Sequence, residues 1–311
     1  MKKHFSAIVI LLLITGSTRL FAQKPAISTF NPASGPVGTL VTITGTNLSA
    51  PTALSIGGQS AIMVSNTGSV IVAMVMPGAA TGAVSITTAI GTASVGNFTV
   101  TATQFPSSQQ GGKLVGTGGV GRAAQGTSVT LSADGNTAIV GGRYDNSGVG
   151  AAWVYTRSGG VWSQQGQKLV GAGASGASWQ GSSVSLSADG NTAIVGGFLD
   201  NSSVGAAWVY TRSGGVWSQQ GQKLVGAGAS GESWQGSSVA LSADGNTAVV
   251  GGTQDNSGAG AAWVYTRNGG VWTQQGSKLV GAGAIGGSGQ GQSVSLSADG
   301  NTAIVGGGLR Q

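Results

Sequence analysis

Leu131-Ser-Ala-Asp-Gly-Asn-Thr-Ala138 is the stretch that decides the fold of this chain. Copies of it begin at Leu186, Leu241 and Leu296. The interval is 55 residues each time, and the sequence between copies is also nearly the same. Self-similarity at a fixed period of this length indicates an array of supersecondary units, each of which buries its apolar side against the next.

Each unit is predicted to form four strands. In the first unit, residues 128–132 and 136–140 meet across an Asp-Gly turn, which is the strongest short hairpin signal. Residues 151–156 then meet 161–164 across a Ser-Gly-Gly turn. A recurring unit of four strands is typical of a β-propeller blade. A β-solenoid-like stack is the alternative, although solenoid coils are usually shorter.

Three complete units and one partial unit follow one another along the chain. They cover residues 113–167, 168–222, 223–277 and 278–311. The partial unit stops after two predicted strands, where the others continue with Gly-Gly-x-x-Asp-Asn. We therefore expect an incomplete propeller and interpret the sequence as truncated near Gly307, because a half blade exposes a strand edge that folded proteins usually avoid.

The units resemble bacterial FG-GAP-type repeats. The likeness lies in Gln-Gly-x-Ser-Val-x-Leu-Ser-Ala-Asp-Gly-Asn-Thr-Ala-x-Val-Gly-Gly, followed by Asp-Asn and Gly-Ala-Ala-Trp-Val-Tyr-Thr-Arg, and it recurs over residues 113–311. The resemblance implies an integrin-like propeller in an extracellular binding or adhesion protein.

A separate domain precedes the repeats. Residues 25–112 contain no charged side chain, whereas most charged side chains from Lys113 onward recur with the repeat. Short β-branched runs separated by Gly, Pro and Asn predict a β-sandwich over residues 25–101, followed by a linker at 102–112.

The opening of this domain resembles the IPT/TIG immunoglobulin-like domain. The likeness is carried by Phe30-Asn-Pro, Gly35-Pro-Val-Gly-Thr and Gly45-Thr-Asn-Leu48. The resemblance implies a spacer or interaction module of a surface or secreted protein. Without a titratable group, this domain cannot supply acid or base chemistry.

Residues 1–22 are predicted to be a signal peptide. Lys2 and Lys3 make a positive start, residues 7–14 are apolar, and Leu20-Phe-Ala22 forms a plausible cleavage end. The apolar stretch is too short to span a bilayer. We therefore expect export through the general secretion pathway to the cell surface or the medium, with no transmembrane segment after signal removal.

Composition excludes several kinds of chemistry. The chain has 59 Gly, no Cys and a single His, His4, which lies in the predicted signal. Abundant Gly disfavours long helices. A mature chain without Cys or His lacks thiol nucleophiles, His-based triads and His-ligated zinc. We expect no enzymatic activity and no cofactor.

The net charge of +6 is partly a property of the signal. Lys2, Lys3 and Arg19 leave with it, so that 14 − 3 = 11 basic residues face 8 acidic ones in the mature chain. The remaining basic residues are scattered singly. Nucleic acid is therefore not an expected partner, because no basic cluster is present to contact phosphates.

The Asp residues of the repeats occupy two positions. The first is the Asp-Gly turn, where Asp tolerates unusual backbone angles and bonds its own backbone. The second follows Gly-Gly and is a weak candidate for calcium, because each loop supplies only one carboxylate and calcium needs several oxygen ligands. The calcium candidates are Asp145, Asp200 and Asp255.

Candidates for ligand contact are the side chains that vary within the nearly invariant unit. Trp179 and Trp234 stand where other units have Ala124 and Gly289, so the blade itself does not require an aromatic there. Tolerance of a solvent-exposed loop explains this variation most simply. Contact with a ligand, such as stacking of both Trp rings on a glycan, is the alternative. The candidates are Trp179, Trp234, Arg143, Tyr144 and Phe198.

These observations together predict an exported, non-enzymatic binding or adhesion protein. The sandwich would act as a spacer, and the propeller repeats would recognise an extracellular protein or glycan. A purely structural repeat protein of the cell surface or matrix is the alternative.

Overall fold

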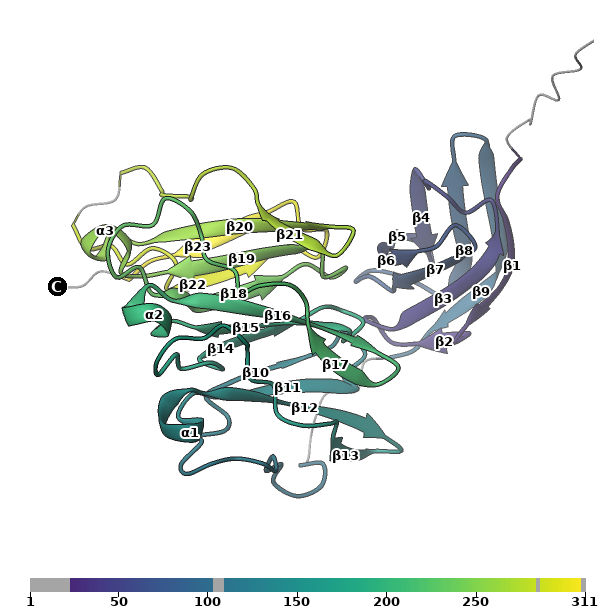
Figure 1. Ribbon diagram of the computed structural model, residues 1–311. Helices are drawn as coiled ribbons and strands as arrows, with labels where there is room; N and C mark the ends of the chain where they lie inside the picture. The colour runs from purple at the N-terminus through teal and green to yellow at the C-terminus, as the bar shows by residue number, and fades with distance from the viewer. Residues whose placement is uncertain (1–22, 103–108, 284–285, 309–311) are drawn as a thin grey trace, which may run out of the picture.

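The computed structural model describes residues 23–102, 109–283 and 286–308 (Figure 1). The predicted signal, residues 1–22, lies outside the described residues. The described chain forms a two-sheet sandwich, three separate four-stranded sheets and one two-stranded sheet. This confirms the prediction of an all-β chain with a sandwich followed by four-stranded blades. No helix in the described part is long and apolar enough to cross a membrane.

The sandwich packs a four-stranded sheet on a five-stranded one. The first sheet has the order β1 (Ala26–Asn31), β3 (Leu40–Thr46), β7 (Val70–Met74), β6 (Ile62–Asn66). The second has the order β2 (Ser34–Gly35), β9 (Gly91–Val100), β8 (Gly82–Thr88), β4 (Ala53–Ile56), β5 (Gln59–Ser60). Alternate residues of the strands point inward, so that Val41, Ile43, Ile86 and Phe98 are fully buried between the sheets.

Each complete blade is an antiparallel meander of four strands. Blade 1 has β10 (Ser128–Leu131), β11 (Thr137–Gly142), β12 (Ala151–Ser158) and β13 (Val161–Gln164). Blade 2 has β14 (Ser183–Leu186), β15 (Thr192–Gly197), β16 (Ala206–Ser213) and β17 (Val216–Gln219). Blade 3 has β18 (Gln235–Leu241), β19 (Thr247–Gly252), β20 (Ala261–Asn268) and β21 (Val271–Gln274). The half blade has β22 (Ser293–Leu296) and β23 (Ala303–Gly306).

A short helical turn links the second and third strands of each complete blade. These turns are α1 (Asp145–Gly148), α2 (Asp200–Ser203) and α3 (Asp255–Gly258). Two central residues of each turn have left-handed backbone angles, as at Asn146, whose φ is 48°. The sequence pattern did not predict this element, because the turn buries only its Asp and, in α1 and α3, one Gly, and has no apolar period.

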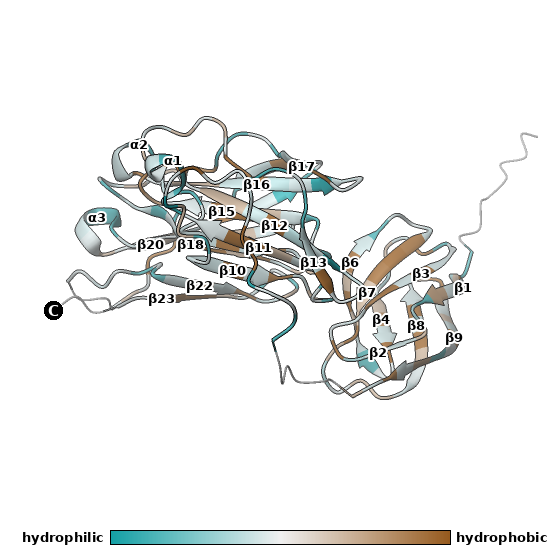
Figure 2. Ribbon diagram, turned by 90° about the horizontal axis from the view of Figure 1, so that it is seen from below, coloured by the Kyte–Doolittle hydropathy of each residue, from teal (hydrophilic) through white to brown (hydrophobic). Residues whose placement is uncertain are grey.

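The blades stack face to face. The first strands β10, β14, β18 and β22 lie next to one another, and apolar side chains of neighbouring sheets form shared cores. Figure 2 shows hydrophobic residues on strands in the interior of the blade stack. Trp208 is fully buried in the core between blades 1 and 2, where its indole N–H donates to the carbonyl of Ala172 at 2.9 Å. Stacking is therefore what buries the apolar faces that a single unit cannot bury alone.

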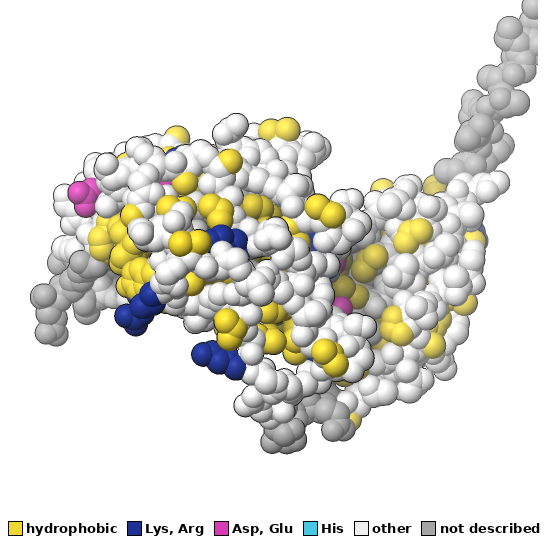
Figure 3. Space-filling model, turned by 60° about the horizontal axis from the view of Figure 1, so that its bottom comes forward, with side chains coloured by type: hydrophobic (Ala, Val, Ile, Leu, Met, Phe, Trp, Pro, Cys, Tyr) yellow, Lys and Arg dark blue, Asp and Glu magenta, His cyan; other side chains and the backbone are white. Residues whose placement is uncertain are grey.

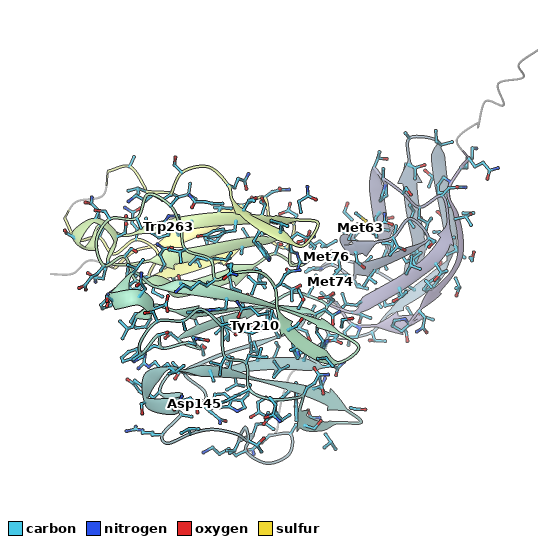
Figure 4. All side chains as sticks on the ribbon, viewed as in Figure 1. Met63, Met74, Met76, Asp145, Tyr210 and Trp263 are labelled. Carbon is cyan, nitrogen blue, oxygen red and sulfur yellow. The ribbon has the colours of Figure 1, made fainter. Side chains whose placement is uncertain are left out.

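The sandwich contacts the Asp-Gly turns of the blades. Val64 of the sandwich forms an apolar cluster with Ala188 and Ala243 of two successive turns, and Met74 packs against it (Figure 4). The turns are joined by backbone hydrogen bonds, such as Ala188 N–H to Ala243 O at 2.9 Å. The sandwich therefore covers the end of the blade stack where these turns lie. A domain that acts only as a spacer would not need this contact.

Three buried tyrosines leave a polar atom without a partner. The hydroxyl groups of Tyr155, Tyr210 and Tyr265 are buried and make no hydrogen bond among the described residues. Burial raises the pKa of Tyr210 above its ordinary value. A buried hydroxyl without a partner costs about 1–3 kcal/mol of desolvation.

Tyr210→Phe is therefore expected to raise the free energy of unfolding by about 1 kcal/mol, because it removes only this hydroxyl. Urea denaturation of both proteins measures the difference. Tyr144→Phe, at a half-buried ring, is the matched control and should leave the free energy unchanged. A loss of stability in Tyr210→Phe would show that the hydroxyl makes a stabilising interaction.

Candidate functional site

The five ligand-contact candidates lie at the end of the blade stack away from the sandwich. Arg143 and Tyr144 directly precede α1, and Phe198 follows β15 just before α2. Trp179 and Trp234 lie in the loops that enter blades 2 and 3. Figure 1 shows α1, α2 and α3 at the end opposite the sandwich.

The entry loop of one blade is tied to the helical turn of the blade before it. The backbone N–H of Trp179 donates to the carbonyl of Gly148 at 2.9 Å, and that of Trp234 donates to Ser203 at 3.0 Å. These bonds place each Trp ring beside the variable pair that precedes the helical turn. Residues far apart in sequence are thereby brought together at every junction between blades.

The five side chains form one continuous row across blades 1 to 3, called the aromatic row below. Ring centroids are 5.0 Å apart for Tyr144 and Trp179, 5.4 Å for Trp179 and Phe198, and 5.2 Å for Phe198 and Trp234. The first two pairs meet edge to face, at 87° and 78°, which is a favourable arrangement of aromatic quadrupoles. All four rings are half-buried, so each keeps part of its surface in solvent.

Arg143 covers the first end of the aromatic row. Its guanidinium carbon lies 4.9 Å from the centre of the Tyr144 ring and 5.0 Å from that of Trp179. A cation at this distance from a ring face is attracted by the negative face of the ring. Figure 3 shows hydrophobic side chains gathered on the blades beside Lys and Arg side chains.

Both Trp residues have a strained backbone. The φ angle is 56° at Trp179 and also at Trp234, which is the left-handed region that bulky residues rarely adopt. The equivalent residues Ala124 and Gly289 have φ angles of 52° and 57°. The loop therefore requires a left-handed residue in every repeat, and an indole at this position costs about 1–2 kcal/mol of backbone energy that Gly would not.

Two hollows border the aromatic row. One, of about 360 Å³, is lined by Tyr144 and Trp179 together with Arg122 and the α1 turn. The other, of about 370 Å³, is lined by Phe198 and Trp234 together with Ser237, Thr253 and Gln292. Hydroxyl, amide and guanidinium groups thus lie beside exposed ring surface, and this combination is typical of sites that bind small or extended ligands.

The calcium candidates are each paired with a lysine. Oδ2 of Asp145, Asp200 and Asp255 accepts from Nζ of Lys168, Lys223 and Lys278, in every case at 2.5 Å. The other carboxylate oxygen accepts a backbone N–H at 2.7 Å, from Val120 at Asp145 for example. The lysine thus supplies the positive charge at each position. No three acidic or His side chains gather among the described residues.

The Asp residues of the hairpin turns bond their own turns. Oδ1 of Asp134 accepts from the Ser132 hydroxyl at 2.5 Å and from the Asn136 N–H at 2.9 Å. Burial by itself raises the pKa of Asp134, but these hydrogen bonds to the charged form outweigh it and hold the pKa below its ordinary value. This is the turn chemistry expected from the sequence.

Some residues of the site had no distinguishing pattern in the sequence. Arg122, Ser237 and Gln292 line the hollows, but they lie in loops where polar residues are common. The lysine partners were not predicted, because each lysine lies far from its Asp in sequence. Lys223, for example, follows Asp200 by 23 residues. Comparison of the lysine and Asp positions in each repeat could have suggested the pairing, since both are fixed at every period.

Comparison with solved structures finds several distant likenesses. An auxiliary nutrient binding protein from Bacteroides thetaiotaomicron is 15% identical, with 92% of this chain and 65% of that chain covered and a TM-score of 0.34. A candidate 6-phosphogluconolactonase from Bacteroides uniformis is 14% identical, with 88% and 77% covered and a TM-score of 0.41. SGBP-B from a Bacteroides uniformis xyloglucan utilization locus is 28% identical over 25% of this chain and 24% of that chain, with a TM-score of 0.23.

The chain thus spans just under two thirds, 65%, of the length of the first of these structures. No curated protein matches it. The family comparison does identify the first domain. Residues 25–110 match the model of the IPT/TIG domain, which confirms the resemblance carried by the run from Phe30 to Leu48.

Proposed function

We propose that this chain is an exported, non-enzymatic binding protein and that the aromatic row is its recognition surface. The favoured ligand is an extracellular glycan, because a sugar ring presents C–H groups that pack on aromatic faces and hydroxyl groups that bond neighbouring polar side chains. The charge and apolar length of residues 1–22 support export. The FG-GAP-type resemblance of residues 113–311 supports a binding or adhesion role.

The observation that carries this proposal is the placement of the variable residues. The large side chains that stand at a few of the positions varying between units come together as a single row of four rings and one guanidinium. Random variation of solvent-exposed loops does not explain why the large side chains meet. The left-handed backbone at both Trp residues has a cost that Gly289 avoids and that Ala124 also bears, so the loop position does not by itself select an aromatic side chain.

The carboxylates support a binding protein rather than an enzyme. Those of the Asp134 type bond their own turns, and those of the Asp145 type are paired with lysines. A calcium ion at Asp145 would have to displace Lys168, so calcium has no part in the proposed function. The mature chain also lacks the Cys and His side chains that most nucleophilic and acid–base mechanisms use.

A panel of extracellular polysaccharides and matrix proteins, immobilised and probed with the purified chain, tests this function. We expect saturable binding to at least one polysaccharide. The double variant Trp179→Ala/Trp234→Gly replaces both Trp residues with Ala and Gly, which other repeats have at this position with the same backbone angles. It should therefore fold normally. Its affinity is expected to fall at least tenfold, since aromatic anchors dominate such interfaces.

Trp162→Ala is the matched control, because Trp162 is also half-buried and also contacts an arginine, Arg157, at 5.5 Å. It lies outside the row and should leave the affinity unchanged. Absence of saturable binding across the panel would favour the purely structural repeat protein. Equal losses in the row variant and the control would place recognition elsewhere.

A further inference from the structure

Two arginines lie at the blade 1 end of the aromatic row. Arg122 lines the hollow that Tyr144 and Trp179 border. The guanidinium carbon of Arg143 lies 4.9 and 5.0 Å from the centres of the same two rings. Arg122 comes from the loop that enters blade 1 and Arg143 from the segment before α1, so the fold of this blade brings two cationic side chains to one pair of rings.

No acidic side chain of the described chain neutralises these two arginines. The three other described arginines each donate to Asn and Gln side chains. Arg122 and Arg143 form no ion pair among the described residues, and Nε of Arg143 is buried there without a hydrogen-bond partner. The carboxylate of the adjoining α1 turn, that of Asp145, is already paired with Lys168. Two positive charges at this end of the row are therefore left for a ligand to neutralise.

The positive charge belongs to blade 1 and is not a property of the repeat. The position of Arg122 is held by Ala177 in blade 2 and by Glu232 in blade 3. Ala177 and Glu232 lie in blades with a neighbour on each side and are exposed, as Arg122 is, so this position stays open to solvent when both neighbouring blades are present. Glu232 also lies two residues before Trp234, the last ring of the row. The row therefore has two guanidinium groups at one end and a carboxylate near the other.

We propose that the ligand of the aromatic row is an acidic polysaccharide, and that Arg122 and Arg143 bind a carboxylate of one of its sugars. This inference rests on the proposed glycan-binding function and names the class of glycan. A guanidinium that lies against aromatic rings keeps its in-plane N–H groups for a planar carboxylate, whose geometry they match. Glu232 repels a carboxylate at the blade 3 end, so the bound polysaccharide has one preferred direction.

Binding to hyaluronan, alginate and polygalacturonate, each compared with its own methyl ester, tests this inference. Esterification removes the charge of the carboxylates and leaves the sugar rings in place, so the pair of affinities isolates the contribution of the charge. Biolayer interferometry at physiological ionic strength, with the mature chain in solution, measures both affinities. We expect at least one acid form to bind at least about tenfold more tightly than its ester, since hydrogen bonds between charged groups contribute a factor of this order.

The double variant Arg122→Ala/Arg143→Phe gives blade 1 the residues that blade 2 has at the same positions, Ala177 and Phe198. It should therefore fold normally, and it keeps an aromatic side chain in the row. Its affinities for the acid and the ester are expected to be equal. Lys24→Ala is the control for removal of a positive charge, since Lys24 is exposed at the start of the sandwich, and it should keep the preference for the acid.

The outcomes separate this inference from the proposed function. Equal binding of acid and ester forms by the unmodified chain would overturn the inference, and so would a preference that survives in Arg122→Ala/Arg143→Phe. Binding to a neutral polysaccharide alone, lost in Trp179→Ala/Trp234→Gly, would overturn the inference and leave the proposed function intact. Binding to no polysaccharide at all would overturn both.

Discussion

Asp200→Ala is expected to lower the free energy of unfolding by about 3–5 kcal/mol, which is the usual cost of removing one partner of a buried ion pair. The Asp200 carboxylate is fully buried and accepts hydrogen bonds from Lys223 Nζ, the Ser175 N–H and the Ser178 hydroxyl. Its loss leaves the ammonium of Lys223, whose side chain is only 21% exposed, and a backbone N–H without an acceptor. Chemical denaturation followed by far-ultraviolet circular dichroism measures the change.

Asp299→Ala is the control for this prediction. Asp299 is exposed and bonds only its own turn, at Ser297 and Asn301, so its removal should cost much less. If Asp200→Ala were no more destabilising than Asp299→Ala, the buried pairs between helical turns and lysines would have no structural role. The Asp145-type position would then need another explanation, including the calcium site considered from the sequence.

Trp208→Ala is expected to cost about 3–5 kcal/mol of the free energy of unfolding, as large-to-small changes of buried aromatics do. The indole is fully buried between blades 1 and 2, where it packs in one cluster with Val184, Leu186 and Tyr210. Its N–H also donates to Ala172 O, so truncation removes a hydrogen bond together with the packing. The same denaturation experiment measures the loss.

Trp217→Ala provides the comparison for Trp208→Ala. Trp217 is half-buried, lies over the guanidinium of Arg212 at 5.4 Å and donates to Gln165 at 3.0 Å. Less than half of the Trp208 effect is expected there. Equal losses at the two positions would contradict the assignment of Trp208 to the shared core of adjacent blades.

The repeat period made most of the blade architecture predictable from the sequence. The Asp-Gly turn at Asp134 determines the hairpin and its register, and the structure places β10 and β11 where the alternating residues predict them. The spacing of glycines also has a structural reason. A Cβ at Gly171 would collide with the indole of Trp208, so the glycine at the entry of each complete blade is required by the buried Trp that lies on it.

The geometry of the candidate site was not predictable in the same way. The sequence identified Trp179 and Phe198 as variable positions, but their contact depends on how the entry loop of one blade lies against the preceding helical turn. That arrangement is set by backbone hydrogen bonds such as Trp179 N–H to Gly148 O, which leave no pattern in the side chains. The left-handed backbone at Trp179 was also not predictable from the sequence, because no Gly marks the position and the strain is overcome by packing.

The geometry of the repeat also begins earlier in the chain than the predicted start of the first unit at residue 113. Gln109, Gln110 and Gly111 have the identities found 55 residues later at Gln164, Gln165 and Gly166. The amide of Gln109 donates to Gly111 O at 2.8 Å, as that of Gln164 does to Gly166 O. Gln110 accepts from Arg157, whereas Gln165 accepts from Arg212. The end of the predicted linker therefore follows the geometry of the repeat.

The central claim is that the aromatic row is the surface that recognises a ligand. The most direct measurement is the indole N–H region of the ¹⁵N nuclear magnetic resonance spectrum, recorded while the polysaccharide that binds best is added. We predict that the signals of Trp179 and Trp234 shift with saturation, whereas those of the buried Trp153, Trp208 and Trp263 do not. Saturable binding that leaves both row signals unchanged would contradict the claim.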